Sequence, residues 1–330
     1  MSIPSRDPIY GLAVLAGAAD WTETLAKRHV HTAYVPITIL TILHTVRVSH
    51  ATRQISGGKN SRLGLFQSVV LDQIVLFAGS SILGTSALTA LALGMPLPIL
   101  IAPFAIALYS SVHILTSITG IGDVLLDLHA HPVIGLVIDL VFCAVDALAR
   151  SEGIVNLGFG MLAAHPDSRI SSALSAKLFT GALLSGGMPL VAQGFQLSSP
   201  VGAWGPTAPA WLQKPALLFF PDLIGGVVVA LVHVILAHGM HADTHHTLAS
   251  ALSTAFSWRA PKTYIPYTPY LSLRETKVVD AVVLFCVLAV PAVIRRVSLL
   301  KPSRATTSAS GRRNKSTRAA RSGRGKYKRE

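Results

Sequence analysis

The sequence has few charged residues and almost no cysteine. Asp, Glu, Lys and Arg make up 13% of its 330 residues, whereas hydrophobic residues make up 51% and the mean hydropathy is +0.54. A soluble globular domain has roughly 25% charged residues, so the composition excludes that class and indicates a polytopic membrane protein. The two cysteines, Cys143 and Cys286, lie in separate apolar runs, which predicts two buried free thiols and excludes a disulfide framework.

Acidic residues are scarce as well, and the net charge of +13 is concentrated at one end of the chain. Residues 301–330 contain 11 Lys or Arg and one Glu, which leaves a charge of only +3 on the other 300 residues. Because the basic charge belongs to a Ser- and Arg-rich tail, we expect disorder there and contact with anionic lipid headgroups. We expect no nucleic-acid partner.

Seven windows of about 20 mainly apolar residues predict transmembrane helices. The chain is therefore expected to be an all-α polytopic membrane protein with an N-terminal luminal segment (1–30), a transmembrane domain (31–298) and a cytoplasmic tail (299–330). The windows are residues 31–48, 65–94, 99–120, 132–149, 171–196, 215–238 and 277–298.

Lys and Arg in short loops predict the orientation, because such loops stay in the cytoplasm. The first connection contains four of these residues and no acid: Arg47, Arg53, Lys59 and Arg62. Seven crossings then place the N-terminus in the lumen and the C-terminus in the cytoplasm. The third connection, with Asp123 and Asp127, departs from the charge rule. The final residues KYKRE place Lys326 and Lys328 in a dilysine pattern that retrieves membrane proteins to the endoplasmic reticulum.

Three ionisable residues share one face of the fourth predicted span. At about 100° per residue, Asp139, Asp146 and Arg150 fall within about 40° of one another. One interpretation is an Asp146–Arg150 pair one helical turn apart, with Asp139 beside a partner helix. The other is the wall of an aqueous pathway, in which the carboxylates would favour cations.

Helix-breaking residues interrupt two of the spans. Gly186, Gly187 and Pro189 lie within the fifth span, and Gly79 and Ser80 lie within the second. Pro189 also leaves the carbonyl four residues earlier without its donor. These residues indicate either an unwound segment beside a water-filled cavity or close packing of helices through small residues.

A loose repeat links these two spans. The second span is followed by Val-His-Ile-Leu at residues 112–115, and the fifth by Val-His-Val-Ile-Leu at residues 232–236. Spans one to three would then correspond to spans four to six. An odd number of helices per repeat inverts the second copy, so we expect two inverted three-helix repeats and an additional seventh helix.

The order of these features resembles the trimeric intracellular cation (TRIC) channel family over residues 31–238. FAGSSILG followed by GMPLPIL resembles the family's glycine-rich second helix, ALYSSVHILTSITGIGDVLLDL its third, LLSGGMPL its kinked fifth and FPDLIGGVVVALVHV its sixth. VFCAVDALARSEGIVNLG resembles the segment with the family's Lys-Glu-Val-x-Arg motif. The motif's Arg falls on Arg150, but its Lys falls on Asp146 and its Glu on Ala147.

The resemblance implies a homotrimer in the endoplasmic reticulum membrane with a potassium-permeable pore in each protomer. Such a channel would pass counter-ion current during calcium release and uptake, and a phosphoinositide lipid would contact Arg150. We expect the carbonyls freed by Gly186, Gly187 and Pro189, together with Ser185, to hydrate a passing cation, and we expect no enzymatic activity.

Two alternatives remain at this stage. A secondary transporter could carry a proton on Asp139 or Asp146. A zinc-dependent enzyme could use the histidines at and after the end of the sixth span, although no Glu stands beside them as general base; they are His233, His238, His241, His245 and His246.

Overall fold

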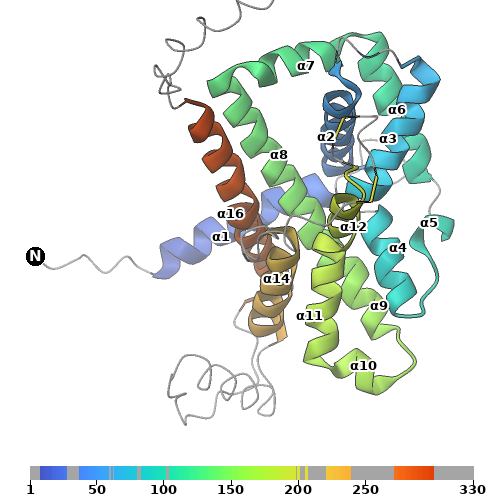
Figure 1. The fold of residues 1–330 in the computed structure, drawn as a ribbon. Coiled ribbons are helices and arrows are strands. Elements are labelled where there is room, and N and C mark those ends of the chain that lie inside the picture. Colours follow the sequence, from blue (N-terminus) through green and yellow to red (C-terminus); the bar gives the residue numbers. More distant parts are fainter. Residues whose placement is uncertain are drawn as a thin grey trace, which may run out of the picture.

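A computed structural model describes most of the chain between residues 8 and 300. The described residues are 8–27, 37–58, 61, 63–79, 83–101, 104–197, 199–200, 205–206, 221–238 and 271–300. Almost all of them are helical, as the sequence predicts (Figure 1).

Seven helical segments occur among the described residues between 8 and 130. They are α1 (Pro8–Lys27), α2 (Ile39–Ser56), α3 (Leu65–Gly79), α4 (Leu83–Ala92), α5 (Pro98–Ile101), α6 (Phe104–Ile118) and α7 (Ile121–Ala130). Local signals set the limits of α2: the Thr38 hydroxyl accepts a hydrogen bond from the Thr41 amide, and Gly57 ends the helix with a φ of 93°. The sequence analysis did not predict α1, which packs against α16, α2 and α8.

The second half contains the longest helices. They are α8 (Pro132–Glu152), the π-helical segment η2 (Gly153–Gly158), α9 (Phe159–Ala163), α10 (Ser168–Ser172), α11 (Leu174–Ala182), the π-helical segment η3 (Leu183–Gly187), α12 (Met188–Gly194), α14 (Pro221–His238) and α16 (Leu273–Leu300). Because α8, η2 and α9 are continuous over residues 132–163, the fourth helix is longer than the predicted span.

Three helices of the described residues are long and apolar enough to cross a membrane: Pro132–Ala163, Leu174–Gly194 and Leu273–Ser298. A fourth candidate appears if α6 and α7, which are bent by 79° relative to each other, count as one span. By length and composition the chain fits a multi-pass membrane protein. The shorter apolar helices, and α2 with its polar residues, do not meet the same criterion, so seven crossings are not established.

The end of α2, the helix α7 and the end of α16 lie at one end of the bundle (Figure 1, top). Arg53 of α2 pairs with Asp123 of α7 at 3.0 Å, and Arg296 of α16 donates to Asp139 near the start of α8. The pairing explains why the third connection departs from the charge rule. The charge of Asp123 is balanced by an arginine of the first connection.

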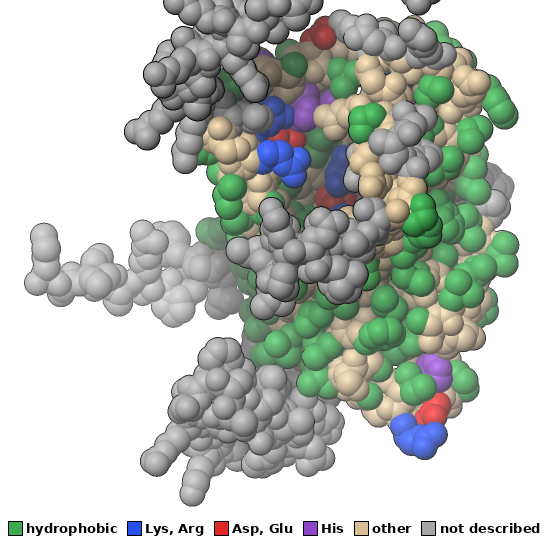
Figure 2. All heavy atoms as spheres, viewed as in Figure 1, with side chains coloured by type: hydrophobic (Ala, Val, Ile, Leu, Met, Phe, Trp, Pro, Cys, Tyr) green, Lys and Arg blue, Asp and Glu red, His purple; other side chains and the backbone are tan. Residues whose placement is uncertain are grey.

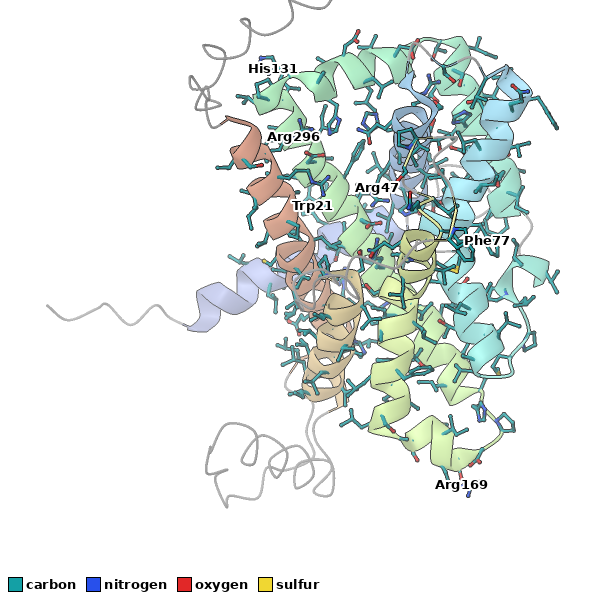
Figure 3. The ribbon with its side chains drawn as sticks, viewed as in Figure 1. Trp21, Arg47, Phe77, His131, Arg169 and Arg296 are labelled. Atoms are coloured by element: carbon teal, nitrogen blue, oxygen red, sulfur yellow. The ribbon has the colours of Figure 1, made fainter. Side chains whose placement is uncertain are left out.

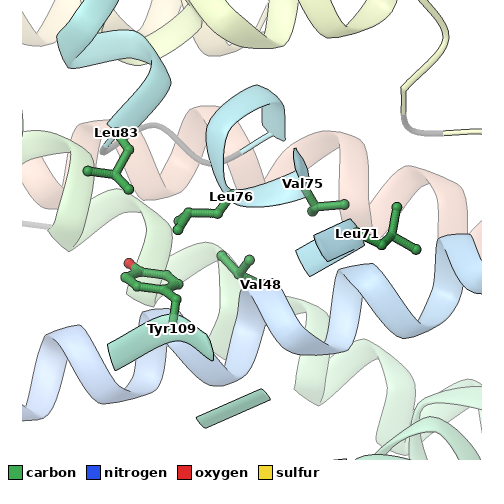
Figure 4. Packing of buried hydrophobic residues seen from close by; sticks show 6 residues of the cluster. All are labelled: Val48, Leu71, Val75, Leu76, Leu83 and Tyr109. Atoms are coloured by element: carbon green, nitrogen blue, oxygen red, sulfur yellow. The ribbon is translucent and has the colours of Figure 1, made fainter. Parts of the chain in front are cut away.

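Two apolar clusters lie inside the bundle. One joins α2, α3, α4 and α6 through Val48, Leu71, Val75, Leu76, Leu83 and Tyr109 (Figure 4). The other joins α8, η2, η3, α14 and α16 through Ala147, Ile154, Leu184, Val229, Ala230 and Leu284. Both cysteines are free, but the expected burial is wrong: Cys143 is half-buried and Cys286 is exposed on α16.

Glycines bring α11 and α14 into close contact. A Cβ atom on Gly226 would overlap the carbonyl oxygen of Gly181 and would lie 2.6 Å from Cβ of Ser185. Such an approach is possible only because neither glycine has a side chain.

The Gly226→Ala variant should therefore lower the stability of the protein, by about 1–3 kcal/mol, because the methyl group forces the two helices apart. The midpoint of thermal unfolding in detergent measures the effect. Gly160→Ala is the control, since a Cβ atom there meets nothing within 4 Å, and it should leave the midpoint unchanged or slightly higher. Equal midpoints for the two variants would contradict this account of the α11–α14 contact.

Candidate functional site

The carboxylate of Asp146, on α8, lies between two guanidinium groups. Its Oδ2 atom is 3.0 Å from Nη2 of Arg47, on α2, and 2.7 Å from Nη2 of Arg150, one turn further along α8. Only 3% of the Asp146 and Arg150 side chains is exposed, against 24% for Arg47. A buried carboxylate is stable where cationic partners compensate its charge. Asp146 therefore joins α2 to α8 by ion pairs.

Arg150 has two further partners on other helical segments. Its Nη1 atom donates to the carbonyl oxygen of Ser185 at 2.7 Å and pairs with the carboxylate of Asp222, near the start of α14. Pro189 has no N–H, so the carbonyl of Ser185, four residues earlier, cannot receive its helical hydrogen bond from that position. The guanidinium group supplies a donor instead. Arg150 thus ties α8 to η3 and α14.

His44 and Tyr109 extend the group to α6. The Nδ1 atom of His44 lies 2.6 Å from the hydroxyl of Tyr109, and its Nε2 atom lies 3.6 Å from Oδ1 of Asp146. With a neutral imidazole, two guanidinium groups balance two carboxylates, which limits the penalty of burying them. These side chains and one backbone carbonyl are called the Asp146 network below: His44, Arg47, Tyr109, Asp146, Arg150, Asp222 and the Ser185 carbonyl.

A cavity of about 290 Å³ borders the Asp146 network. It lies between the end of α1, the start of α2 and the junction of α8 with η2. Its polar wall consists of Thr38, Thr41, His44, Arg150, Glu152 and Asn156. Within the described residues, Nε of Arg150 and Nε2 of His44 are buried without a hydrogen-bond partner. A polar cavity of this size has room for water that could satisfy such atoms.

A second charged group lies nearer the start of α8. Arg296 donates from Nε to Oδ2 of Asp139 at 2.6 Å, and Nε2 of His129 is 2.7 Å from Oδ1 of the same carboxylate. Charged and histidine side chains gather in a hollow between α8, α16 and α2 (Figure 2). Arg47 and Arg296 lie on opposite sides of this space (Figure 3). The sequence suggested, as one interpretation of the fourth span, that Asp146 pairs with Arg150 and that Asp139 contacts a partner helix. The structure contains both contacts.

The prediction of an unwound fifth helix is wrong. Residues 174–194 remain helical through η3, and Gly186 and Gly187 lie within that segment. A Cβ atom on Gly186 would lie 2.5 Å from the amide nitrogen of Leu223, and one on Gly187 would lie 2.9 Å from Cδ2 of Leu88. The glycines therefore permit close packing. The Ser185 carbonyl, expected to hydrate a cation, instead accepts a hydrogen bond from Arg150.

The second predicted span is divided between α3 and α4. Gly79 is the last residue of α3, whereas Ser80 lies outside the described residues, as do Lys326, Lys328, His241, His245 and His246. The second and fifth predicted spans meet, because α4 packs against η3 and α3 packs against α12. No cluster of three or more potential metal ligands occurs in the described part of the chain.

The sequence analysis identified none of His44, Tyr109 and Asp222 as site residues, and it used Arg47 only as a positive charge of the first connection. His44 and Arg47 are three positions apart on α2. This spacing places them on one helical face and could have indicated a polar partner on a neighbouring helix. The sequence analysis included His113 and His233 in the repeated segments but predicted no contact for either residue. In the structure Nδ1 of His113 lies 3.0 Å from Asp72, and Nδ1 of His233 lies 2.6 Å from Asp280.

Comparison with protein-family models, with curated proteins and with solved structures found no match for this chain. The functional argument therefore depends on the Asp146 network and on the spaces beside it.

The Asp146→Asn variant should be destabilised by about 3–5 kcal/mol, because it removes the carboxylate that two guanidinium groups share. A lower midpoint of thermal unfolding, or loss of monodisperse protein in detergent, would show this. Asp167→Asn is the control, since the ion pair of Asp167 is with the 89%-exposed Arg169 side chain and asparagine can still accept the N-cap hydrogen bond from the Arg169 amide. It should therefore unfold like the unaltered protein. An Asp146→Asn protein as stable as that control would contradict the structural role of the network.

Proposed function

We propose that the chain forms a channel for monovalent cations, with potassium as the physiological ion, in the endoplasmic reticulum membrane. One observation carries the proposal: residues of the Asp146 network lie both beside the charged hollow and in the wall of the cavity. Arg47 belongs to the hollow, whereas His44 and Arg150 line the cavity. Polar and ionisable groups inside a membrane protein commonly mark an ion pathway. The network would be the barrier between two water-filled parts of such a pathway.

The network also accounts for how the barrier could open. Guanidinium groups beside the path repel cations, so the arrangement described here is closed to them. Arg47 has the more exposed side chain and, among the described residues, pairs with Asp146 alone, whereas Arg150 is held by three acceptors. Displacement of Arg47 toward the hollow would leave one side of the Asp146 carboxylate facing the path. A carboxylate at that position favours cations over anions.

The helix arrangement supports an inverted repeat. We infer that α2, α3/α4 and α6 form one repeat and that α8, α11/α12 and α14 form the other, with α16 as the additional helix. The second and fifth helices would then cross near the interruption between α3 and α4 and the π-helical segment η3, and the packing of α4 against η3 agrees with such a crossing.

Location and assembly are proposed on the basis of the sequence. The dilysine pattern of Lys326 and Lys328 favours the endoplasmic reticulum with a cytoplasmic C-terminus, and the resemblance to TRIC channels favours a homotrimer that supports calcium release and uptake. Arg150 is less suited to a phosphoinositide headgroup than the resemblance implies, because Asp146, Asp222 and the Ser185 carbonyl already bind its guanidinium group.

The transporter alternative finds less support. It required Asp139 or Asp146 to exchange a proton, but each carboxylate contacts an arginine. A guanidinium partner opposes protonation of a carboxylate, since protonation would leave the positive charge unbalanced.

Full-length protein reconstituted in planar bilayers under a potassium chloride gradient tests the channel. We expect a linear single-channel current that reverses near the potassium equilibrium potential. Arg47→Gln should increase the potassium conductance several-fold, because it removes a positive charge from the barrier. Arg169→Gln, at the opposite end of the molecule (Figure 3), should leave the conductance unchanged. Reversal near the chloride potential, or saturating flux without channel current, would refute the proposal.

A further inference from the structure

A buried carboxylate–imidazole pair lies apart from the Asp146 network. Asp72 of α3 and His113 of α6 are both 0% exposed, and Oδ1 of Asp72 lies 3.0 Å from Nδ1 of His113. The two residues are called the Asp72–His113 pair here. Neither residue was identified as a site from the sequence, and the channel proposed above does not use them.

Hydroxyl groups of α2 and α3 lie beside both members of the pair. Thr52 of α2 donates to Oδ1 of Asp72 at 3.0 Å, and Ser49 of α2 lies 2.9 Å from Nδ1 of His113. Ser68 of α3 lies 2.7 Å from Nε2 of His113. The remaining carboxylate oxygen, Oδ2 of Asp72, is buried without a hydrogen-bond partner in the described part of the chain.

The charged groups nearest in sequence are engaged elsewhere. Arg53 follows Thr52 on α2, but its guanidinium group binds Asp123 and Ser117. Tyr109, one turn before His113 on α6, bonds to His44. Among the described residues, no Lys or Arg forms an ion pair with Asp72. This separates Asp72 from Asp139 and Asp146, whose carboxylates are balanced by arginines.

A proton would supply the missing positive charge. When the imidazole is neutral, the pair has a net charge of −1 in an apolar interior, which is strongly unfavourable. When His113 holds a second proton, imidazolium and carboxylate balance. The ring can then donate from Nε2 to the Ser68 hydroxyl and from Nδ1 to the Ser49 hydroxyl, both of which are able to accept, while the Asp72 carboxylate lies 3.0 Å from Nδ1. The arrangement of acceptors therefore fits the protonated ring.

The pair is connected to one end of the bundle. Ser68 is half-buried in the first turn of α3, close to the end where α7 lies. On α2, the apolar residue Val48 lies between the turn with His44 and the turn with Thr52, and it packs with Leu71, Leu76 and Tyr109 (Figure 4). The Asp72–His113 pair and its hydroxyl partners share no residue with the Asp146 network.

We propose that the Asp72–His113 pair is a proton-binding site open to the side of the membrane on which α7 lies. A proton from water on that side binds the Ser68 hydroxyl oxygen while the hydroxyl proton passes to Nε2 of His113, so the imidazole becomes an imidazolium beside the Asp72 carboxylate. Release follows the reverse path. The ligand is a proton, and the site does not depend on whether the protein conducts potassium.

Nitrogen NMR of ¹⁵N-histidine-labelled, full-length protein in lipid nanodiscs tests the site directly. The His113 signals are those lost in His113→Gln protein. We expect His113 to be an imidazolium at pH 7 and to lose one proton as the pH is raised, whereas in Asp72→Asn protein the imidazolium signal at pH 7 should be absent. The signals of His131, which is exposed at the start of α8, should be the same in both proteins and serve as the internal control.

A second variant tests the route and retains the pair if Asp72→Asn fails to fold. Ser68→Ala keeps both titrating groups, so the imidazolium signal at pH 7 should persist, but exchange of its Nε2 proton with water should slow severalfold. A His113 ring that stays neutral from pH 5 to 9 would overturn the proton site. An unchanged imidazolium signal in Asp72→Asn would overturn the role of the carboxylate, and unchanged exchange in Ser68→Ala would overturn the route.

Discussion

The guanidinium group of Arg150 is the interaction on which the centre of the molecule depends. A buried positive charge is tolerated only when anionic or carbonyl oxygens surround it, and Arg150 obtains these from α8, η3 and α14. Asp146 then recruits Arg47, which adds α2. Since no single helix can supply all these partners, the helices must come together in one arrangement for any of the charges to be buried. The network therefore selects the packing as well as stabilising it.

This requirement also explains the composition of the fifth helix. Gly181 and Gly186 allow the backbone of α14 to approach closely enough for Asp222 to reach Arg150. Pro189 cannot donate to the Ser185 carbonyl, which becomes available to the same guanidinium group. π-Helical turns are frequent at functional sites, and here two of them, η2 and η3, lie beside the network. Residues that weaken an isolated helix thus make a buried charge possible.

The sequence predicts local features well and distant partners poorly. Helical periodicity predicted the common face of Asp146 and Arg150, and the apolar windows located most of the long helices. These sequence patterns could not show that Asp222, 72 positions beyond Arg150, completes the site. The number of residues between two helices does not specify whether those helices contact each other. The unwound fifth helix was predicted from propensity alone. Tertiary packing and a side-chain donor compensate for the glycines and proline, so the helix continues.

The polarity of α2 has a single physical explanation. This helix is too polar to qualify as a membrane span by composition, yet it lies among α3, α6, α7 and α8. Its polar residues face different neighbours: Arg47 binds α8, Thr52 binds α3 and Arg53 binds α7. A helix that finds partners for most of its polar side chains on surrounding helices need not meet lipid. Within a membrane it would hold its polar groups against other helices of the protein and not against lipid.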